Sequence, residues 1–263
     1  MSILFRVLRI LVPSLLLASC VTPTAAPVAD APNSRSAAEP FVIAANPLAA
    51  KAGLDVLARG GSAVDAAIAV QAMLSLVEPQ SSGVGGGAFM TYFDAAAGKV
   101  RVFDGREVAP AQASPTMFLD ASGTPLGFAQ AVVSGRATGV PGAVKMLAAA
   151  HQAHGKLPWH SLFDGPRRTA ADGFIVSPRL ARLVHMNTPE IAVPDARTYF
   201  SRADGSLIEA GDRLRNPAYA AFLGRLARLG PDALYKGETA ARIVAKTRAA
   251  PLGGTMTMAD LAA

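Results

Sequence analysis

The sequence predicts an α/β protein in which the strands come early and helices dominate the later part of the chain. Segments with helical spacing of apolar residues recur from residue 47 onward, and two β-prone segments follow each other between residues 88 and 104. Hydrophobic residues make up 51% of the 263 positions and charged residues 17%, so the chain can bury a large core in one large or two small domains. A wholly disordered chain is excluded.

The first 19 residues have the pattern of an export signal. Arg6 and Arg9 precede the apolar run 10–17, which is too short and too interrupted to cross a bilayer as a stable helix. The run is followed by Ala-Ser-Cys, which resembles the lipobox of bacterial lipoproteins, where the cysteine takes a diacylglycerol and becomes the mature N-terminus. We therefore expect residues 1–19 to be a lipoprotein-type signal and Cys20 to be the lipid attachment site. The implied location is exported and periplasmic, with a lipid anchor in a bacterial membrane.

An ordinary secretory signal, cut later near residues 24–26, is the alternative interpretation, and it would discard Cys20. Cys20 is the only cysteine, so no disulfide within the chain and no cysteine zinc cluster can form. Residues 20–39 are rich in Pro, Ala, Thr, Ser and Asn with almost no bulky apolar side chain, so burial cannot offset the entropy of ordering them. We predict a disordered tether over 20–39 and a folded part over 40–263.

The folded part is expected to begin with a strand and a helix. Residues 41–44, Phe-Val-Ile-Ala, are suited to a buried strand. The Asn-Pro pair at 46–47 provides an N-cap and a proline at the first helical position, which predicts a helix over 47–59. The glycine pair at 60–61 supplies the backbone freedom that ends this helix.

A second helix is predicted from Ser62 to about Leu76. Ser62 and Asp65 form a variant of the capping box, in which the hydroxyl serves the amide of Asp65 and the carboxylate lies in the favourable field of the first turn. Small residues along the helix suit close packing, and Glu78-Pro79 stops it.

The segment VEPQSSGVGGGAFM, residues 77–90, follows that helix and leads into a strand. A phosphate-binding loop has the opposite order, strand and then helix, and carries a Gly-Lys-Ser/Thr that this segment lacks. The glycines at 85–87 are therefore interpreted as positions where the backbone takes dihedrals, or makes close approaches, that a Cβ would block.

A β-hairpin is predicted next. Residues 88–93 are aromatic and β-branched, residues 94–98 form a polar-ended turn, and residues 99–104 alternate polar and apolar as a half-buried strand does. The hairpin delivers the Gly-Arg-Glu sequence at 105–107 to its end, where side chains are commonly accessible.

Arg106 is the candidate binding residue at that end. A guanidinium can clasp a carboxylate through two parallel hydrogen bonds, which is how a site would fix the acid group of an α-amino acid. The alternative is a surface ion pair with Glu107 or Asp104. The later part of the chain is predicted to be mainly helical, with helices over 143–154, 159–171, 178–185, 217–229 and 239–248.

Other polar residues carry weaker signals. His151 and His154 stand three apart, but a third zinc ligand has no obvious source, so they are interpreted as solvated cations at a helix C-terminus. Ser81, Ser82 and Ser134 lack the Gly-x-Ser-x-Gly of a nucleophile elbow and are interpreted as turn or cap residues. We predict no metal and no cofactor.

The formal charge of +6 is spread over the chain. No run of Lys and Arg interleaved with aromatics occurs, so a nucleic-acid partner is not predicted, whereas an acidic small substrate is compatible with this charge.

Nine motifs, in their order and spacing, resemble the N-terminal part of a gamma-glutamyltranspeptidase. They are 44–49 (AANPLA), 60–67 (GGSAVDAA), 78–89 (EPQSSGVGGGAF), 104–110 (DGREVAP), 139–142 (GVPG), 157–159 (LPW), 215–217 (RNP), 235–238 (YKGE) and the segment 253–262. The resemblance extends over essentially everything after the tether.

The resemblance implies an N-terminal-nucleophile hydrolase with an αββα sandwich, made as a proenzyme that cuts itself into a large and a small subunit. The small subunit's new N-terminal threonine attacks the γ-glutamyl amide of glutathione, and water or an acceptor amino acid then resolves the γ-glutamyl-enzyme. Arg106 stands where the family's arginine binds the α-carboxylate of the γ-glutamyl group. The implied partners are small γ-glutamyl compounds and the small subunit from the same precursor.

The family's catalytic threonine segment, Thr-Thr-His-x-Ser, does not occur up to Ala263, so the nucleophile is expected beyond that residue. We therefore expect the sandwich to be incomplete in this chain and the chain alone to be inactive. Two other functions remain open: a cephalosporin or glutaryl acylase of the same fold, and a non-catalytic surface lipoprotein that keeps the fold for binding.

Overall fold

The computed structural model describes residues 39–249 and 251–263, and Pro40–Ala263 form one compact unit. The expected export signal, Cys20 and the tether up to residue 38 lie outside the described residues. The helices, in chain order, are α1 (Pro47–Ala58), α2 (Ala63–Val77), α3 (Phe128–Val132), η1 (Gly135–Ala137), α4 (Ala143–His154), η2 (Trp159–Phe163), α5 (Asp164–Asp172), α6 (Pro178–Val184), α7 (Pro189–Ala192), α8 (Pro194–Tyr199), α9 (Pro217–Leu229), α10 (Asp232–Tyr235), α11 (Gly237–Thr247) and α12 (Met258–Ala262). The strands are β1 (Ala88–Asp94), β2 (Lys99–Gly105), β3 (Phe174–Ile175) and β4 (Arg213–Leu214).

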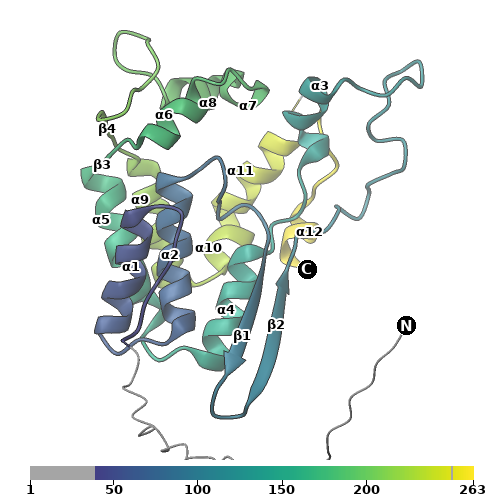
Figure 1. Cartoon of the computed structure of the whole chain (residues 1–263). Coiled ribbons are helices and arrows are strands. Elements are labelled where there is room, and N and C mark those ends of the chain that lie inside the picture. The colour runs from purple at the N-terminus through teal and green to yellow at the C-terminus, as the bar shows by residue number, and fades with distance from the viewer. Residues whose placement is uncertain (1–38, 250) are drawn as a thin grey trace, which may run out of the picture. The chain divides into compact units, whose positions relative to one another are not determined.

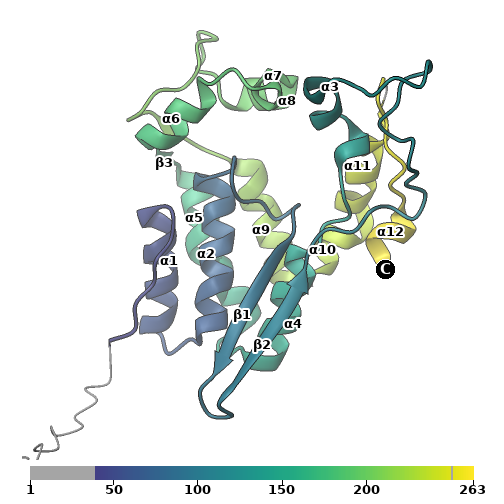
Figure 2. The same cartoon turned by 45° about the vertical axis from the view of Figure 1, so that its right-hand side comes forward.

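Helices form the body of this unit, and a long hairpin lies against it. Helices α1, α2, α5 and α9 pack side by side, and the β1–β2 hairpin lies across α4 (Figure 1). The short helices α6 to α8 lie at the end opposite the hairpin turn, where α7 approaches α3 (Figure 2). The result is the predicted mixture of α and β structure, with helices dominating the later part.

The first two helices form as their caps predict. The Asn46 side chain accepts a hydrogen bond from the amide of Leu48 at 3.0 Å, and Gly60 ends the first helix with φ of +84°. Ser62 and Asp65 make the capping box of α2 in both directions. The apolar side of α2 is buried against α1 and α4, with Ile68 and Leu76 both about 1% exposed.

The hairpin has one packed face and one exposed face. Its strands pair antiparallel, with Phe89 opposite Asp104 and Phe93 opposite Val100. Tyr92 and Phe103 face α4, where both rings contact the imidazole of His154. The other face is apolar but open, since its large side chains are 62–66% exposed; these are Phe89, Phe93, Val100 and Val102.

The strand predicted over 41–44 is wrong. This segment is extended but has no hydrogen-bonded strand partner among the described residues. Phe41 and Ile43 are exposed, whereas Val42 packs against α1, where it contacts the position of Gly53. The composition of this segment favours an extended backbone, which it has, but a strand also needs a neighbouring strand that hydrogen-bonds to its amides and carbonyls.

The later helices agree with the prediction to within a few residues, with one change and several additions. The helix expected over 159–171 divides into the 3₁₀ helix η2 and α5. The short helices α3, α7 and α8 and the two-residue ladder of β3 and β4 were not predicted, because elements of two to six residues give too short a periodic signal.

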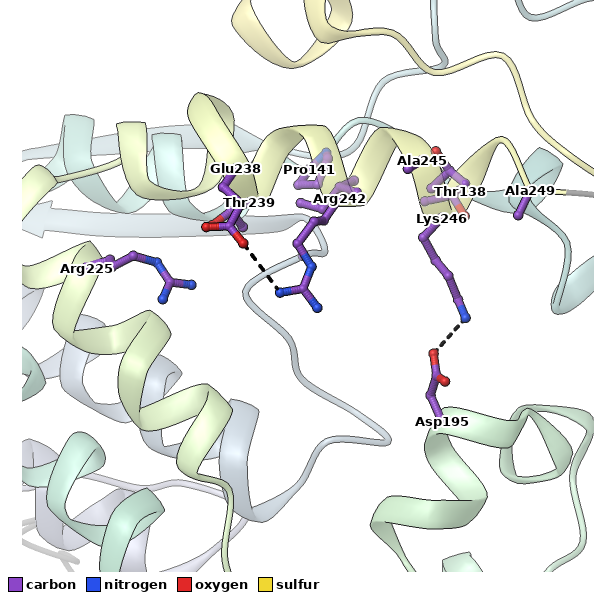
Figure 3. Close-up of a pocket in the computed structure, with 13 residues that line it drawn as sticks. Thr138, Pro141, Asp195, Arg225, Glu238, Thr239, Arg242, Ala245, Lys246 and Ala249 are labelled. Carbon is purple, nitrogen blue, oxygen red and sulfur yellow. Dashed lines mark hydrogen bonds and ion pairs between the residues drawn. The ribbon is translucent and has the colours of Figure 1, made fainter.

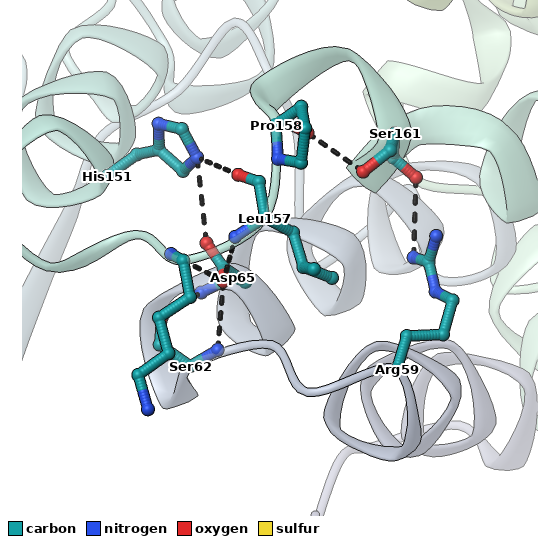
Figure 4. A network of polar contacts seen from close by, with 8 residues as sticks. Arg59, Ser62, Asp65, His151, Leu157, Pro158 and Ser161 are labelled. Atoms are coloured by element: carbon teal, nitrogen blue, oxygen red, sulfur yellow. Dashed lines mark hydrogen bonds and ion pairs between the residues drawn. The ribbon is translucent and has the colours of Figure 1, made fainter.

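A buried carboxylate joins the start of α2 to the connection after α4 (Figure 4). Asp65 is fully buried, and its Oδ2 accepts hydrogen bonds from the amides of Ser62 at 2.8 Å, Lys156 at 2.9 Å and Leu157 at 3.0 Å. Burial by itself raises the pKa of Asp65, but the hydrogen bonds from Ser62, Leu157 and Lys156 together outweigh it and hold that pKa below its usual value.

The two histidines of α4 are packed against other parts of the protein, whereas the sequence predicted that they are solvated at the helix end. His151 Nε2 donates to the carbonyl of Leu157 at 2.9 Å and lies 3.6 Å from Asp65 Oδ1. His154 stacks on Tyr92 with ring centroids 4.2 Å apart, and its Nε2 is buried without a hydrogen-bond partner among the described residues. The charge-based interpretation failed because the hairpin and the 155–158 connection cover this helix end.

Candidate substrate-binding site

The candidate site lies where the hairpin ends, and close backbone packing fixes its position. Gly105 touches Met146 of α4, and a Cβ at Gly105 would overlap that side chain. Gly142, just before α4, packs in the same way on the carbonyl oxygen of Gly105. Residue 106 therefore leaves the strand at a point held directly against the start of α4.

Arg106 is exposed and already has a carboxylate partner. Its amide donates to Asp104 Oδ1 at 2.9 Å, its Nη1 lies 3.3 Å from Glu107 Oε2, and its side chain is 68% exposed. The ion pair with Glu107 that the sequence left open is therefore present. A pair this exposed contributes little, about 0–1 kcal/mol, so a ligand carboxylate can compete for the guanidinium or share it.

Glu107 is held in place by glycines. Its Oε1 accepts a hydrogen bond from the amide of Gly87 at 2.6 Å, and its Cβ packs against Gly139. A Cβ at either glycine would overlap Glu107. The pairing of Val108 with Val140 continues this contact along the chain.

The glycine-rich loop thus works through close approach. Gly87 makes room for Glu107, and the carbonyl of Gly86 accepts hydrogen bonds from the amides of Gly142 at 3.2 Å and Ala143 at 3.0 Å. None of the glycines at 85–87 has a positive φ, and a Cβ at Gly85 would meet open space. The predicted backbone role is confirmed for Gly87 alone, as a close approach, because a Cβ at Gly86 would make only ordinary contacts at 3.5 Å or more.

The start of the loop is tied down by Glu78, a residue that the sequence indicated only as a helix stop. Glu78 is 2% exposed, and its carboxylate accepts hydrogen bonds from the side-chain amides of Asn46 at 3.1 Å and Gln80 at 2.5 Å. Arg179 Nε lies 3.3 Å from the same carboxylate. A glutamate at the end of an otherwise apolar helix was the available signal, but two of its three partners, Asn46 and Arg179, are distant in sequence.

The serines that were weighed as nucleophiles make local structural contacts. Ser82 Oγ accepts from Gln71 Nε2 at 2.9 Å, and Ser134 Oγ donates to the carbonyl of Ala131 at 2.7 Å. Ser81 Oγ lies 3.4 Å from Arg179 Nη2. Within residues 39–249 and 251–263, none of the three hydrogen-bonds a histidine.

A groove of about 800 Å³ opens near the loop, between α8, α9 and α11 (Figure 3). Gly85 and Pro141 line it, and Lys246 bridges to Asp195 across it at 2.6 Å. Arg106 is not among its lining residues, and the charges that line it are mixed in sign. Its ion-paired side chains are largely solvated, and because Arg106 does not line it, the groove is distinct from the candidate site.

Metal and membrane features are limited in the part of the chain that the structure describes. That part brings no three His, Cys, Asp or Glu side chains together in a way that would hold a metal ion. None of its helices combines the length and the apolar character that a membrane crossing requires.

Comparison with known structures first defines the class of fold. The crystal structure of Helicobacter pylori gamma-glutamyltranspeptidase superposes with a TM-score of 0.78 at 29% identity, covering 85% of this chain and 63% of that one. Cephalosporin acylase from Bacillus halodurans superposes with a TM-score of 0.66 at 28% identity, covering 82% and 40% of the respective chains. The fold is that of the N-terminal-nucleophile hydrolases, as the sequence predicts.

The sequence comparisons define the family. The family model described as gamma-glutamyltranspeptidase matches residues 49–263. The glutathione hydrolase proenzyme of Bacillus subtilis strain 168 is 36% identical over 221 residues, which is 84% of this chain and 37% of that protein. The chain belongs to the gamma-glutamyltranspeptidase family, and it spans little more than a third of the length of that relative.

Proposed function

We propose that this chain is the donor-binding part of a gamma-glutamyltransferase that also acts as a glutathione hydrolase. In this proposal Arg106 binds the α-carboxylate of a γ-glutamyl compound such as glutathione, and a threonine of a small subunit made from the same precursor attacks the γ-amide. The observation that carries the proposal is the exposed guanidinium of Arg106, positioned through Glu107 on the amide of Gly87. The name proenzyme in the Bacillus subtilis relative supports processing of a precursor.

The residues of the site are suited to binding rather than to bond breaking. The planar guanidinium can donate two parallel hydrogen bonds to a carboxylate, and its present carboxylate partner is Glu107, 3.3 Å from Nη1. Fixing the acid end of the donor sets where its γ-amide lies, which is the orientation that an attacking hydroxyl needs. Acylation and deacylation then divide amide cleavage into two easier steps, and water or an amino acid takes the γ-glutamyl group.

The test is the substitution Arg106→Lys in the full-length precursor. Lysine keeps the charge but loses the planar fork, so we expect KM for γ-glutamyl-p-nitroanilide to rise about tenfold or more, with a smaller change in kcat. Arg101→Lys, at an exposed position of strand β2, which ends just before Arg106, is the matched control and should change neither constant. An unchanged KM in Arg106→Lys would remove Arg106 from the site, and a full-length precursor that cannot hydrolyse this compound would refute the proposed activity.

An acylase function is the second candidate, because the fold also matches the cephalosporin acylase of Bacillus halodurans. A glutaryl donor has the γ-acyl chain of a γ-glutamyl donor but lacks the α-amino group. Comparing kcat/KM for γ-glutamyl-p-nitroanilide and glutaryl-p-nitroanilide separates the two functions. A preference for the glutaryl compound would favour the acylase.

Export with a lipid anchor at Cys20 is part of the proposal and depends on the sequence of residues 1–20 alone. Labelling cells with radioactive palmitate should mark the wild-type protein and leave Cys20→Ala unlabelled. Equal labelling of both would refute the anchor.

A further inference from the structure

A second cavity, of about 560 Å³, lies between the loop that follows α2 and the helices α6 to α8. Pro79, Gln80 and Ser81 form its loop side, and α6 and α7 form most of the remainder. Its size falls within the range of small-molecule pockets in proteins, which are typically apolar with a few fixed polar groups. It shares no lining residue with the Arg106 site.

Arg179 forms the polar end of this cavity, and an ion pair with Glu78 orients its guanidinium. Its Nε lies 3.3 Å from the carboxylate of Glu78, which is buried and is also hydrogen-bonded by two side-chain amides. Because the guanidinium meets Glu78 through Nε, the edge formed by Nη1 and Nη2 is left for another partner. The one hydrogen bond from that edge to the described residues is the long one from Nη2 to Ser81 Oγ at 3.4 Å.

Most of the remaining lining is apolar, with Thr188 and Glu190 as its polar members. Leu183 and Ile191 are half-buried, and Met186 is 59% exposed at the edge of the cavity. An unbranched methionine at the mouth of a pocket adapts to apolar ligands of different shape. Glu190 also lines the cavity, and with Glu78 behind Arg179 it disfavours a multiply charged anion.

We propose that this cavity binds a small amphipathic carboxylic acid. The acid group would lie on the Nη1–Nη2 edge of Arg179 and the hydroxyl of Ser81, and the apolar body would lie against Leu183, Met186 and Ile191. This site goes beyond the proposed function and does not depend on it, because none of the residues that line it hydrogen-bonds or ion-pairs with Arg106 or Glu107.

The experiment uses 4-phenylbutyrate as the probe and 4-phenylbutanol as its uncharged analogue. The protein is this chain of 263 residues, with ¹³C-labelled methionine and isoleucine methyl groups. We expect saturable shifts of the Met186 and Ile191 methyl signals with the acid, and binding of the alcohol weaker by about tenfold or more. Absence of saturable shifts at about 10 mM acid, or equal binding of acid and alcohol, would overturn the proposal.

Two variants test the two ends of the cavity. Arg179→Gln should weaken binding of the acid about tenfold, while Arg182→Gln, an exposed arginine of the same helix outside the cavity, should leave it unchanged. Because Arg179→Gln also removes a partner of buried Glu78, Met186→Glu provides a second variant at an exposed position. It should weaken the acid more than the alcohol through like-charge repulsion, and equal effects on both ligands would contradict the proposed orientation.

Discussion

Glu107 accepts a hydrogen bond from the backbone amide of Gly87, with 2.6 Å between Oε1 and N, although the two residues are 20 positions apart. The same carboxylate carries the ion pair with Arg106. The glycine-rich loop and the candidate binding arginine are therefore linked through a single side chain.

The substitution Gly87→Ala should break the link between the glycine-rich loop and Glu107. A Cβ at this position would lie 2.6 Å from the amide nitrogen of Glu107 and would overlap its carboxylate, so the hairpin end must shift. We expect a loss of about 1–3 kcal/mol in the free energy of unfolding, measured by urea denaturation. Gly85→Ala is the matched control, since its Cβ would meet open space, and an equal loss in both variants would show that the Glu107 contact is not the cause.

The same pair of variants bears on binding in the full-length precursor. Displacing Glu107 moves the partner that holds Arg106, so Gly87→Ala should raise KM for γ-glutamyl-p-nitroanilide, and Gly85→Ala should leave KM unchanged. A normal KM in Gly87→Ala would mean that Arg106 does not depend on Glu107 for its position.

Asp65 should make stability depend on pH. Its pKa is lowered in the folded protein, so the unfolded chain takes up a proton at a higher pH than the folded one. The stability from this group is therefore complete above its ordinary pKa of about 4 and is lost as the pH falls through the lower, folded-state value. Urea denaturation between pH 7 and pH 3 should show this fall.

The substitution Asp65→Asn tests whether Asp65 causes the loss of stability at low pH. The amide oxygen can replace Oδ2 as the acceptor for the three backbone amides, but the negative charge that they stabilise is lost. We therefore expect a loss of about 1–3 kcal/mol at pH 7 and a flatter pH profile. Asp55→Asn, at an exposed position of α1, should change the free energy of unfolding by less than about 0.5 kcal/mol. An unchanged pH profile in Asp65→Asn would assign the acid sensitivity to other groups.

The two faces of the hairpin should respond differently to substitution. Phe103→Ala removes a ring that packs on His154 and should cost about 2–3 kcal/mol in the free energy of unfolding. Val102→Thr, at the neighbouring position on the exposed face, should cost less than about 0.5 kcal/mol in this chain. Similar losses in both would indicate that the outer face is covered in solution.

Local signals predicted much of this structure. The caps at Asn46 and Ser62 fixed the starts of the first two helices, because capping depends on residues within one turn. The alternation of polar and apolar residues identified the hairpin and placed Arg106 at its end. These features are decided by neighbours in the sequence, and the structure reproduces them.

The sequence pattern did not predict the contacts between distant parts of the chain. Asp65 was recognised as a cap but not as the acceptor for Lys156 and Leu157, which lie more than 90 positions away. His154 was interpreted as a surface cation because no residue near it in the sequence indicates that the ring of Tyr92 packs on it. Glu78 could be found as a helix stop but not as the anchor of a loop, since its partners come from three separate segments.

Asn46 uses both ends of its side chain, the oxygen toward the amide of Leu48 and the nitrogen toward Glu78. Aspartate or serine would cap the helix as well as asparagine does, yet aspartate would set a second negative charge beside a buried one, and serine is too short to reach it. Among residues that cap a helix equally well, asparagine is therefore favoured at position 46 by Glu78, which lies 32 residues further along the chain. A substitution that keeps the cap would still disturb Glu78 and the loop that precedes the hairpin.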